Sequence, residues 1–112
     1  MSKYALGLDF GTLNGRVLLV DVDTGEEVGT SVYAYSCGVI DKYLPDSEIE
    51  LGLDWALQNP ADYIDVLEHA VPDVLQISGV SPEDVIGIGV DFTSSTILPI
   101  DADGVPLCLY DQ

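Results

Sequence analysis

The stretch "LGLDFGTLNGRVLLVDVDTGEE", from Leu6 to Glu27, decides how the first part of this chain folds. A run rich in leucine stops at Gly-Thr-Leu-Asn-Gly, and a run rich in valine begins at Arg16, the only arginine of the chain. Apolar runs of this length that are bounded by glycine-containing turns indicate β-strands. We therefore expect strands over residues 4–10 and 16–23.

A second turn and a third strand continue this pattern. The segment "DVDTGEE" is typical of a turn, with Asp23, Thr24 and Gly25 closing a second hairpin. Residues 27–36 then alternate in residue type, as a third strand would. The chain is therefore expected to open with three sequential antiparallel strands, followed by an irregular surface segment over residues 38–59.

The clearest helical pattern of the chain lies between Asn59 and Gly79. Asn59 can cap a helix, Pro60 suits the first helical position, and Gly79 can end it. Pro72 falls inside this pattern and should kink the helix or divide it into two pieces. Residues spaced three and four apart give the helix one apolar face, formed by Tyr63, Val66, Leu67, Val71, Val74 and Leu75.

The remaining residues again indicate strands. Short apolar runs predict strands over 85–92 and 96–101, and "DADG" predicts the turn that follows. An antiparallel meander followed by a helix and further strands is typical of the α/β class. The length of 112 residues suits a single domain over 1–112. Because the chain stops just after a turn, we expect it to be a fragment.

Charge and composition exclude several classes of partner. Twenty acidic residues against three basic ones give a formal net charge of -17 at pH 7, which argues against binding to nucleic acid or to an anionic membrane. No apolar stretch approaches the roughly 20 residues of a membrane span, and the N-terminus lacks the features of a signal peptide. Cys37 and Cys108 form no disulfide framework and lack metal-site spacing. We therefore expect a cytoplasmic protein.

Two interpretations of the first turn stay open on the residues alone. In the first, it is a tight hairpin whose Asp9 and Asn14 bond to the turn backbone. In the second, it is a loop that holds phosphate, because Gly11 lets backbone N–H groups approach an anion and Arg16 offers a fork of donors. Asp9 could then hold Mg²⁺, directly or through water. The Gly-Lys-Ser/Thr ending of a P-loop is missing.

Other polar segments are candidates for a sugar site. The hydroxyl run Thr93–Thr96 follows a strand, and it can bond sugar hydroxyls or form an ordinary polar turn. Trp55 can stack on a sugar face and Gln58 can bond a hydroxyl, whereas anchoring in the core is the more common role of a lone tryptophan. His69 lies in the middle of the expected helix, and we interpret it as a surface residue.

Four segments, in this order, resemble the FGGY family of carbohydrate kinases, and in particular its ribulokinase branch. They are "LGLDFGTLNGRVLLVD", "GVIDKYLP", "WALQNPADY" and "GIGVDFTSSTILPIDADGVPLC". The resemblance implies a two-domain sugar kinase of the actin-like ATPase superfamily, with a ribonuclease-H-like core in each domain. ATP would bind with the sugar between the domains. The γ-phosphoryl group would pass to a hydroxyl of a ketopentose such as L-ribulose, as in arabinose catabolism.

The same resemblance implies roles for individual residues. Asp9 would act near the magnesium–phosphate centre, with Mg²⁺ held through water. Ser94 and Ser95 would contact the sugar, and Trp55 would help to wall its site. A small residue, often alanine, stands near Ser94 in ribulokinases, so serine leaves the sugar preference open. The first phosphate loop would comprise Gly11, Thr12, Asn14 and Arg16.

The family's catalytic base is an aspartate well downstream, beyond these 112 residues, so we expect no catalytic residue and no kinase activity in this chain alone. A non-catalytic actin-like module, which would use the same loop for nucleotide binding, filament assembly or partner binding, is the alternative. A small acidic domain without a ligand is a third interpretation. The sequence does not decide whether the protein forms a homo-oligomer.

Overall fold

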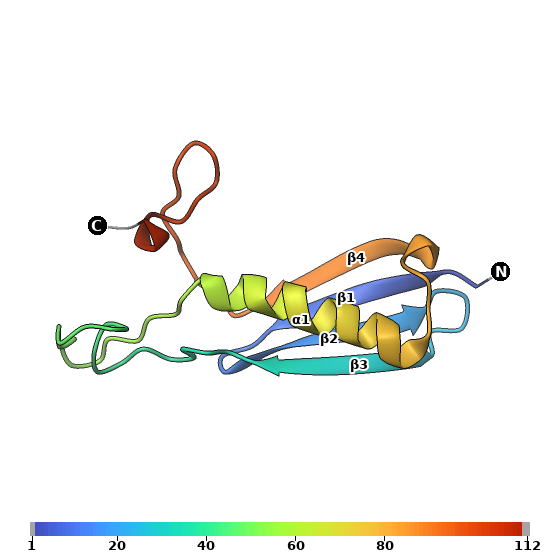
Figure 1. Ribbon diagram of the computed structural model, residues 1–112, viewed down its shortest axis with the longest axis horizontal. Coiled ribbons are helices and arrows are strands. Elements are labelled where there is room, and N and C mark those ends of the chain that lie inside the picture. The colour runs from blue at the N-terminus through green and yellow to red at the C-terminus, as the bar shows by residue number, and fades with distance from the viewer. Residues whose placement is uncertain (1, 111–112) are drawn as a thin grey trace.

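The computed structural model describes residues 2–110, and its centre is a mixed sheet of four strands with one long helix across one face (Figure 1). The sheet order is β3-β2-β1-β4. Strands β1 (Tyr4–Phe10), β2 (Asn14–Asp21) and β3 (Glu27–Ala34) form an antiparallel meander, and β4 (Val85–Phe92) pairs with β1 in parallel. The expected α/β class and the expected meander are both confirmed.

Helix α1 (Ala61–Ser78) ends before Gly79 as its sequence predicts, but it begins one residue later than expected, because Pro60 is the N-cap residue and not the first helical residue. The side-chain oxygen of Asn59 accepts a hydrogen bond from the backbone N–H of Ala61 at 3.0 Å, and Gly79 closes the helix in the left-handed conformation (φ 72°). The expectation that Pro72 divides the helix is wrong, because α1 runs through it as one element. Pro72 is exposed, so water can bond the carbonyl that proline leaves without its helical partner.

The core lies between α1 and the face of the sheet that carries the even-numbered side chains of β1. Leu6 pairs in register with Leu19, and Leu8 pairs with Val17. Because side chains alternate along a strand, these four point to the same face, and all four are buried. The apolar face of α1 covers them, and the whole buried apolar cluster is Leu6, Leu8, Val17, Leu19, Tyr35, Val66, Ala70 and Val74.

Two irregular segments extend from the end of the sheet at which α1 begins (Figure 1). The first leads from β3 to α1, and isolated bridges such as Ile40 with Leu57 order it. The second follows β4, where the predicted strand over 96–101 is wrong. Only Ile100 forms a bridge there, with Pro106, and Ile97 is 91% exposed. Pro99 cannot donate to a ladder, and among residues 2–110 no strand lies beside this segment.

Two short 3₁₀ helices complete the described part: η1 (Pro82–Asp84), which leads into β4, and η2 (Leu107–Leu109). The expected turn at "DADG" is confirmed, since the Asp101 side chain accepts hydrogen bonds from the N–H groups of Asp103 and Val105. No helix within residues 2–110 combines the length and the apolar character that a membrane crossing requires.

Candidate functional site

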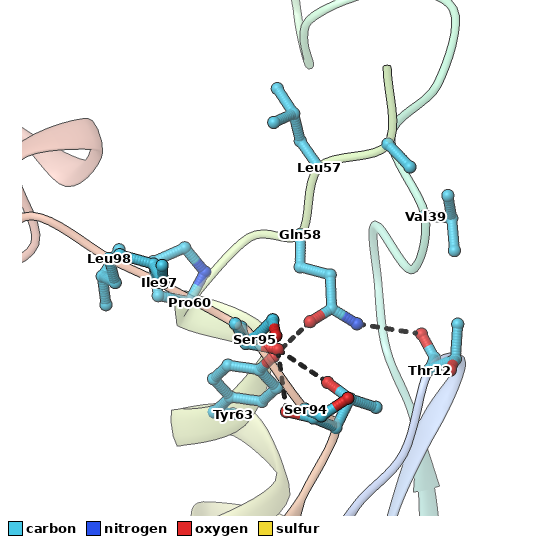
Figure 2. A pocket seen from close by; sticks show the side chains of 13 residues that line it. Thr12, Val39, Leu57, Gln58, Pro60, Tyr63, Ser94, Ser95, Ile97 and Leu98 are labelled. Carbon is cyan, nitrogen blue, oxygen red and sulfur yellow. Dashed lines mark hydrogen bonds between the residues drawn. The ribbon is translucent and has the colours of Figure 1, made fainter. Parts of the chain in front are cut away.

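Three segments meet where β1 and β4 end: the turn between β1 and β2, the segment that leads into α1, and the residues that follow β4. Because these strands are parallel, their carboxyl ends lie at the same edge of the sheet, and α1 begins at that edge (Figure 1). A cavity of about 390 Å³ lies between these segments. Figure 2 shows its lining, which comprises Thr12, Val39, Ala56, Leu57, Gln58, Pro60, Tyr63, Thr93, Ser94, Ser95, Thr96, Ile97 and Leu98. The first turn and the hydroxyl run, 80 residues apart in the sequence, thus share one cavity.

The hydroxyl run forms a turn in which its outer members bond to each other. The Thr93 and Thr96 hydroxyls lie 2.7 Å apart, and Thr96 also donates to the Thr93 carbonyl at 3.1 Å. Ser95 has a left-handed backbone (φ 61°), which is uncommon for serine. None of the hydrogen bonds found within residues 2–110 uses the Ser94 or Ser95 hydroxyl. These two hydroxyls are therefore free to bond a polar ligand.

The first turn has the geometry of a tight hairpin. Phe10 and Gly15 are register partners, and the Gly11 N–H donates to the Asn14 carbonyl at 2.9 Å. The expected hydrogen bonds from the side chains of Asp9 and Asn14 to this turn are absent from the described residues. The hairpin interpretation is confirmed for the backbone, and it is compatible with a loop that binds phosphate.

Two side chains hold the carbonyl groups of this turn. The Tyr35 hydroxyl donates to the Gly11 carbonyl at 2.9 Å, and the Gln58 amide donates to the Thr12 carbonyl at 3.4 Å. The Tyr63 hydroxyl donates in turn to the Gln58 side-chain oxygen. Successive carbonyls of the turn are therefore fixed by residues from outside the hairpin.

Tyr35 also belongs to an aromatic cluster under the turn. The Tyr63 ring packs edge-on against Phe10, with centroids 5.2 Å apart, and against Tyr35 at 5.7 Å. Burial raises the pKa of Tyr35 to about 12, and interactions with Tyr63, Asp62 and Asp9 act in the same direction. The raised pKa keeps the Tyr35 hydroxyl protonated, and a donor to Gly11, between about pH 10 and pH 12, where an ordinary tyrosine ionises.

Asp62 is a buried carboxylate that the sequence analysis missed. It lies in the first turn of α1, is 3% exposed, and accepts hydrogen bonds from the N–H groups of Cys37 (3.4 Å) and Gly38 (3.2 Å). A carboxylate also complements the positive end of the helix dipole. Asp62 therefore ties the segment after β3 to the start of α1, next to the cavity. The available signal was an acidic residue in the first turn after Asn-Pro, at the second position after Pro60.

A second hollow, of about 410 Å³, contains Asp9, Arg16 and Asp91 in its lining. Asp9 is the register partner of Arg16 on one side and of Asp91 on the other. Strand alternation puts Asp9 on the sheet face opposite to Leu8 and therefore opposite to α1. Within residues 2–110 no group of three histidine, cysteine or acidic side chains is arranged to hold a metal ion.

The predicted phosphate-loop residues are thus divided between two places. Thr12 lines the first cavity, Asp9 and Arg16 line the second hollow, and neither lining includes Gly11 or Asn14. Of the predicted sugar residues, Ser94 and Ser95 line the first cavity.

Four other residues considered in the sequence do not line the cavity. The side chain of Trp55 is half-exposed and packs against Gly52, so its part in sugar binding stays a prediction. His69 is exposed and stacks on Tyr33 with ring centroids 4.4 Å apart, which confirms a surface position. Cys37 and Cys108 are both free thiols.

The chain is similar in sequence to ribulokinases. It is 53% identical over 111 residues to the ribulokinase of Halalkalibacterium halodurans and 58% identical over 110 residues to that of Geobacillus thermodenitrificans. These alignments cover 99% and 98% of this chain, and 20% and 19% of the relatives. The chain therefore spans about a fifth of the length of the curated relatives it matches, and it corresponds to their N-terminal part. No protein-family model matches.

The fold is that of sugar kinases. A gluconate kinase from Lactobacillus acidophilus superposes with a TM-score of 0.70 at 19% identity, over 96% of this chain and 19% of that one. A xylulose kinase from Rhodospirillum rubrum gives 0.68 at 19% identity, over 94% and 19%. The sheet and helix match the N-terminal domain of sugar kinases with the actin-like ATPase fold. The resemblance to carbohydrate kinases of the ribulokinase type is confirmed.

Proposed function

We propose that this chain is the N-terminal segment of an ATP-dependent sugar kinase that phosphorylates a ketopentose such as L-ribulose. One observation carries the proposal beyond the sequence similarity: Thr12 of the first turn and the free hydroxyls of Ser94 and Ser95 line the same cavity. A kinase has to bring a phosphate-binding loop and a sugar-binding site this close, because phosphoryl transfer depends on positioning the two substrates.

The first turn would bind the phosphates of ATP. Gly11 has no side chain to block an anion, and the Thr12 hydroxyl can donate to it. Arg16 is exposed and offers a fixed positive charge with several donors. In a chain with a net charge of -17, this one guanidinium offsets part of the repulsion that ATP would meet. The proposed ATP-binding residues are Gly11, Thr12, Asn14 and Arg16, which would contact the phosphates, and Asp9, which would act through Mg²⁺.

Mg²⁺ would accompany ATP. The available oxygen donors suit this ion. Asp9 and Asp91 are exposed carboxylates and register partners on neighbouring strands, and Mg²⁺ prefers oxygen ligands while keeping several waters. When bound, Mg²⁺ supplies charge neutralisation of the phosphate groups. Asp9 would hold the ion through water, and Arg16 on the neighbouring strand would orient the same phosphates.

The sugar would bind in the first cavity. Ser94 and Ser95 would donate to and accept from its hydroxyls, and Trp55 would approach it from the loop before α1. In the reaction a sugar oxygen forms the new P–O bond, the bond between the β and γ phosphates breaks, and ADP leaves. The proton of the attacking hydroxyl would pass to a base in the second domain of the longer protein, which we propose also binds the adenosine. The free thiols agree with a cytoplasmic location.

The test uses the full-length protein in a coupled assay of ADP release with L-ribulose and other ketopentoses. The wild type should turn over with at least one ketopentose. Ser94→Ala and Ser95→Ala should raise KM for the sugar about tenfold, the usual scale for a lost hydrogen bond, with little change in KM for ATP. Arg16→Ala should instead raise KM for ATP.

Ser81→Ala is the matched control, because Ser81 is exposed and its side chain makes no capping hydrogen bond. It should behave as the wild type. A full-length protein that turns over no ketopentose would contradict the proposed function. Equal effects of Ser94→Ala on both KM values would contradict the proposed sugar site.

A further inference from the structure

Gln58 occupies a position between the two halves of the candidate site. It lines the cavity with Ser94 and Ser95 on one side and Thr12 on the other, and its amide nitrogen donates to the Thr12 carbonyl in the first turn (Figure 2). Its amide oxygen accepts the Tyr63 hydroxyl. Because an amide group is planar and rigid, the nitrogen and the oxygen of Gln58 move together. A shift of the Gln58 amide therefore alters its hydrogen bonds to Tyr63 and to Thr12 together.

Aromatic packing holds Tyr63 in place. Its ring packs edge-on against Phe10 and Tyr35, and Tyr35 itself holds the Gly11 carbonyl. The carbonyls of Gly11 and Thr12 are thus bonded to two side chains that both contact Tyr63. The distance of 3.4 Å from Gln58 to Thr12 is long for an N–H···O hydrogen bond, for which about 2.9–3.0 Å is usual. The distance between the Gln58 nitrogen and the Thr12 oxygen can therefore shorten before it reaches the usual value.

We propose that Gln58 is a positioning residue that couples occupation of the sugar cavity to the conformation of the phosphate loop. This inference rests on the proposed function. A sugar hydroxyl that enters the cavity and contacts Ser94 or Ser95 lies beside the Gln58 amide, and ordering that amide shortens its bond to Thr12. The loop then presents its N–H groups to ATP in one conformation. By reciprocity of binding free energies, bound sugar should tighten ATP binding, and bound ATP should tighten sugar binding.

The experiment uses the full-length protein and measures the dissociation constant for a non-hydrolysable ATP analogue with and without saturating sugar, together with kcat and both KM values. Gln58→Glu keeps the oxygen that accepts from Tyr63 but replaces the donor to Thr12 with an oxygen that repels its carbonyl. This variant should lose the sugar-dependent gain in nucleotide affinity and lower kcat about three- to tenfold. Tyr63→Phe, which keeps the ring packing, should show the same change to a smaller extent.

Gln76→Glu is the matched control, since Gln76 is exposed on α1 far along the helix from the cavity. It should retain wild-type coupling. Wild-type coupling in Gln58→Glu, or a change confined to KM for the sugar, would overturn the inference while leaving the proposed function in place. A wild type without ketopentose turnover would overturn both. Unchanged melting temperatures of the variants would exclude loss of fold as the cause.

Discussion

Val66 of helix α1 packs directly against Gly15 of strand β2, at the point where the sheet approaches the first turn. A Cβ atom placed on Gly15 would lie 2.6 Å from both methyl carbons of Val66 and 3.0 Å from its Cβ. Non-bonded contacts of a Cβ atom are essentially never shorter than 3.0 Å, so the helix lies this close to β2 only because residue 15 is glycine. The same turn of α1 carries Asp62 and Tyr63, so this contact also sets the position of the candidate site.

Gly15→Ala should therefore destabilise the 112-residue chain. Both methyl carbons of Val66 are on a side chain that is 1% exposed, so neither can move aside without disturbing the core. Overpacking of this kind usually costs about 1–3 kcal/mol, and chemical denaturation would measure it. Gly87→Ala is the matched control on β4, because a Cβ there meets nothing within 4 Å. Equal free energies of unfolding for the two variants would contradict the close packing.

Tyr35 should make the chain lose stability in alkaline solution. Burial, followed by interactions with Tyr63, Asp62 and Asp9, raises its pKa to about 12, whereas a tyrosine in an unfolded chain titrates near 10. Between these values the unfolded state binds fewer protons than the folded state. Stability therefore falls as pH rises through this window, by up to about 2 kcal/mol, and is fully present below about pH 10.

The measurement compares the free energy of unfolding at pH 8 and at pH 11 for the wild type and for Tyr35→Phe. The Phe variant should lose less stability between the two pH values, although it starts lower because the bond to Gly11 is gone. Tyr43→Phe, at a tyrosine that is 55% exposed, should follow the wild type. The same pH-dependent loss in Tyr35→Phe as in the wild type would show that another group is responsible.

Asp62→Asn should separate the segment after β3 from helix α1. Asparagine keeps one oxygen but replaces the other with an amide that cannot accept from the N–H of Cys37 or Gly38. The remaining oxygen can accept from only one of these two donors, and a buried donor left without a partner costs about 1–3 kcal/mol. Hydrogen exchange should therefore become faster at Cys37 or at Gly38. Glu68→Gln removes a charge at an exposed position of the same helix and should change neither quantity. Unchanged exchange at both Cys37 and Gly38 in Asp62→Asn would contradict the role of Asp62 in holding this segment.

The elements that the sequence predicts correctly are those whose signals are local. The strand Val85–Phe92 was predicted with the observed bounds, and Gly79 ends α1 as predicted because capping depends on neighbouring backbone groups. The start of α1 was predicted to within one residue: Pro60 is the N-cap, and Asn59 bonds to the N–H of Ala61. The expected strand over 96–101 failed for a reason that is not local. Its apolar residues favour a strand, yet no partner strand lies beside it among the described residues.

The candidate site was predictable in its residue types and not in its connections. Asp9, Arg16, Ser94 and Ser95 stand at the ends of strands, which the apolar runs already indicated. The bonds that join the site link residues 24 positions apart, as for Asp62 and Gly38, or 46 apart, as for Gln58 and Thr12. No spacing rule in the sequence relates such residues, because the pairing of β1 with β4 and the placement of α1 bring them together.

A row of exposed apolar side chains on β4 should give the 112-residue chain a surface that binds apolar molecules. Ile86, Ile88, Val90 and Phe92 are 57–65% exposed. On β1, Leu6 and Leu8 are buried under α1, and their register partners on β4 are Ile88 and Val90. The helix does not cover these partners, because a hollow of about 450 Å³ separates α1 from the start of β4. Contiguous exposed apolar surface of this kind binds other apolar molecules.

The chain should therefore bind a fluorescent apolar dye, and Ile88→Ser should reduce the fluorescence. Stability should change by less than about 1 kcal/mol, because the replaced side chain is mostly exposed. Ile77→Ser is the matched control, since Ile77 has the same exposure of 64% but lies alone on α1. If both variants reduce the fluorescence equally, the row on β4 is not the binding surface.

The 112-residue chain should not transfer phosphate by itself, although the full-length protein should. The proposed function assigns to the described residues a loop for phosphate, carboxylates for Mg²⁺ and hydroxyls for a sugar. Phosphoryl transfer also requires a base and a second set of contacts on the nucleotide, placed together with these. The proposed function puts both outside residues 1–112. Incubation of the 112-residue chain with ATP, Mg²⁺ and L-ribulose should release no ADP above the background, while the full-length protein in the same assay serves as the positive control. Robust ADP release by the 112-residue chain, dependent on L-ribulose and abolished by Arg16→Ala, would contradict this division of the site.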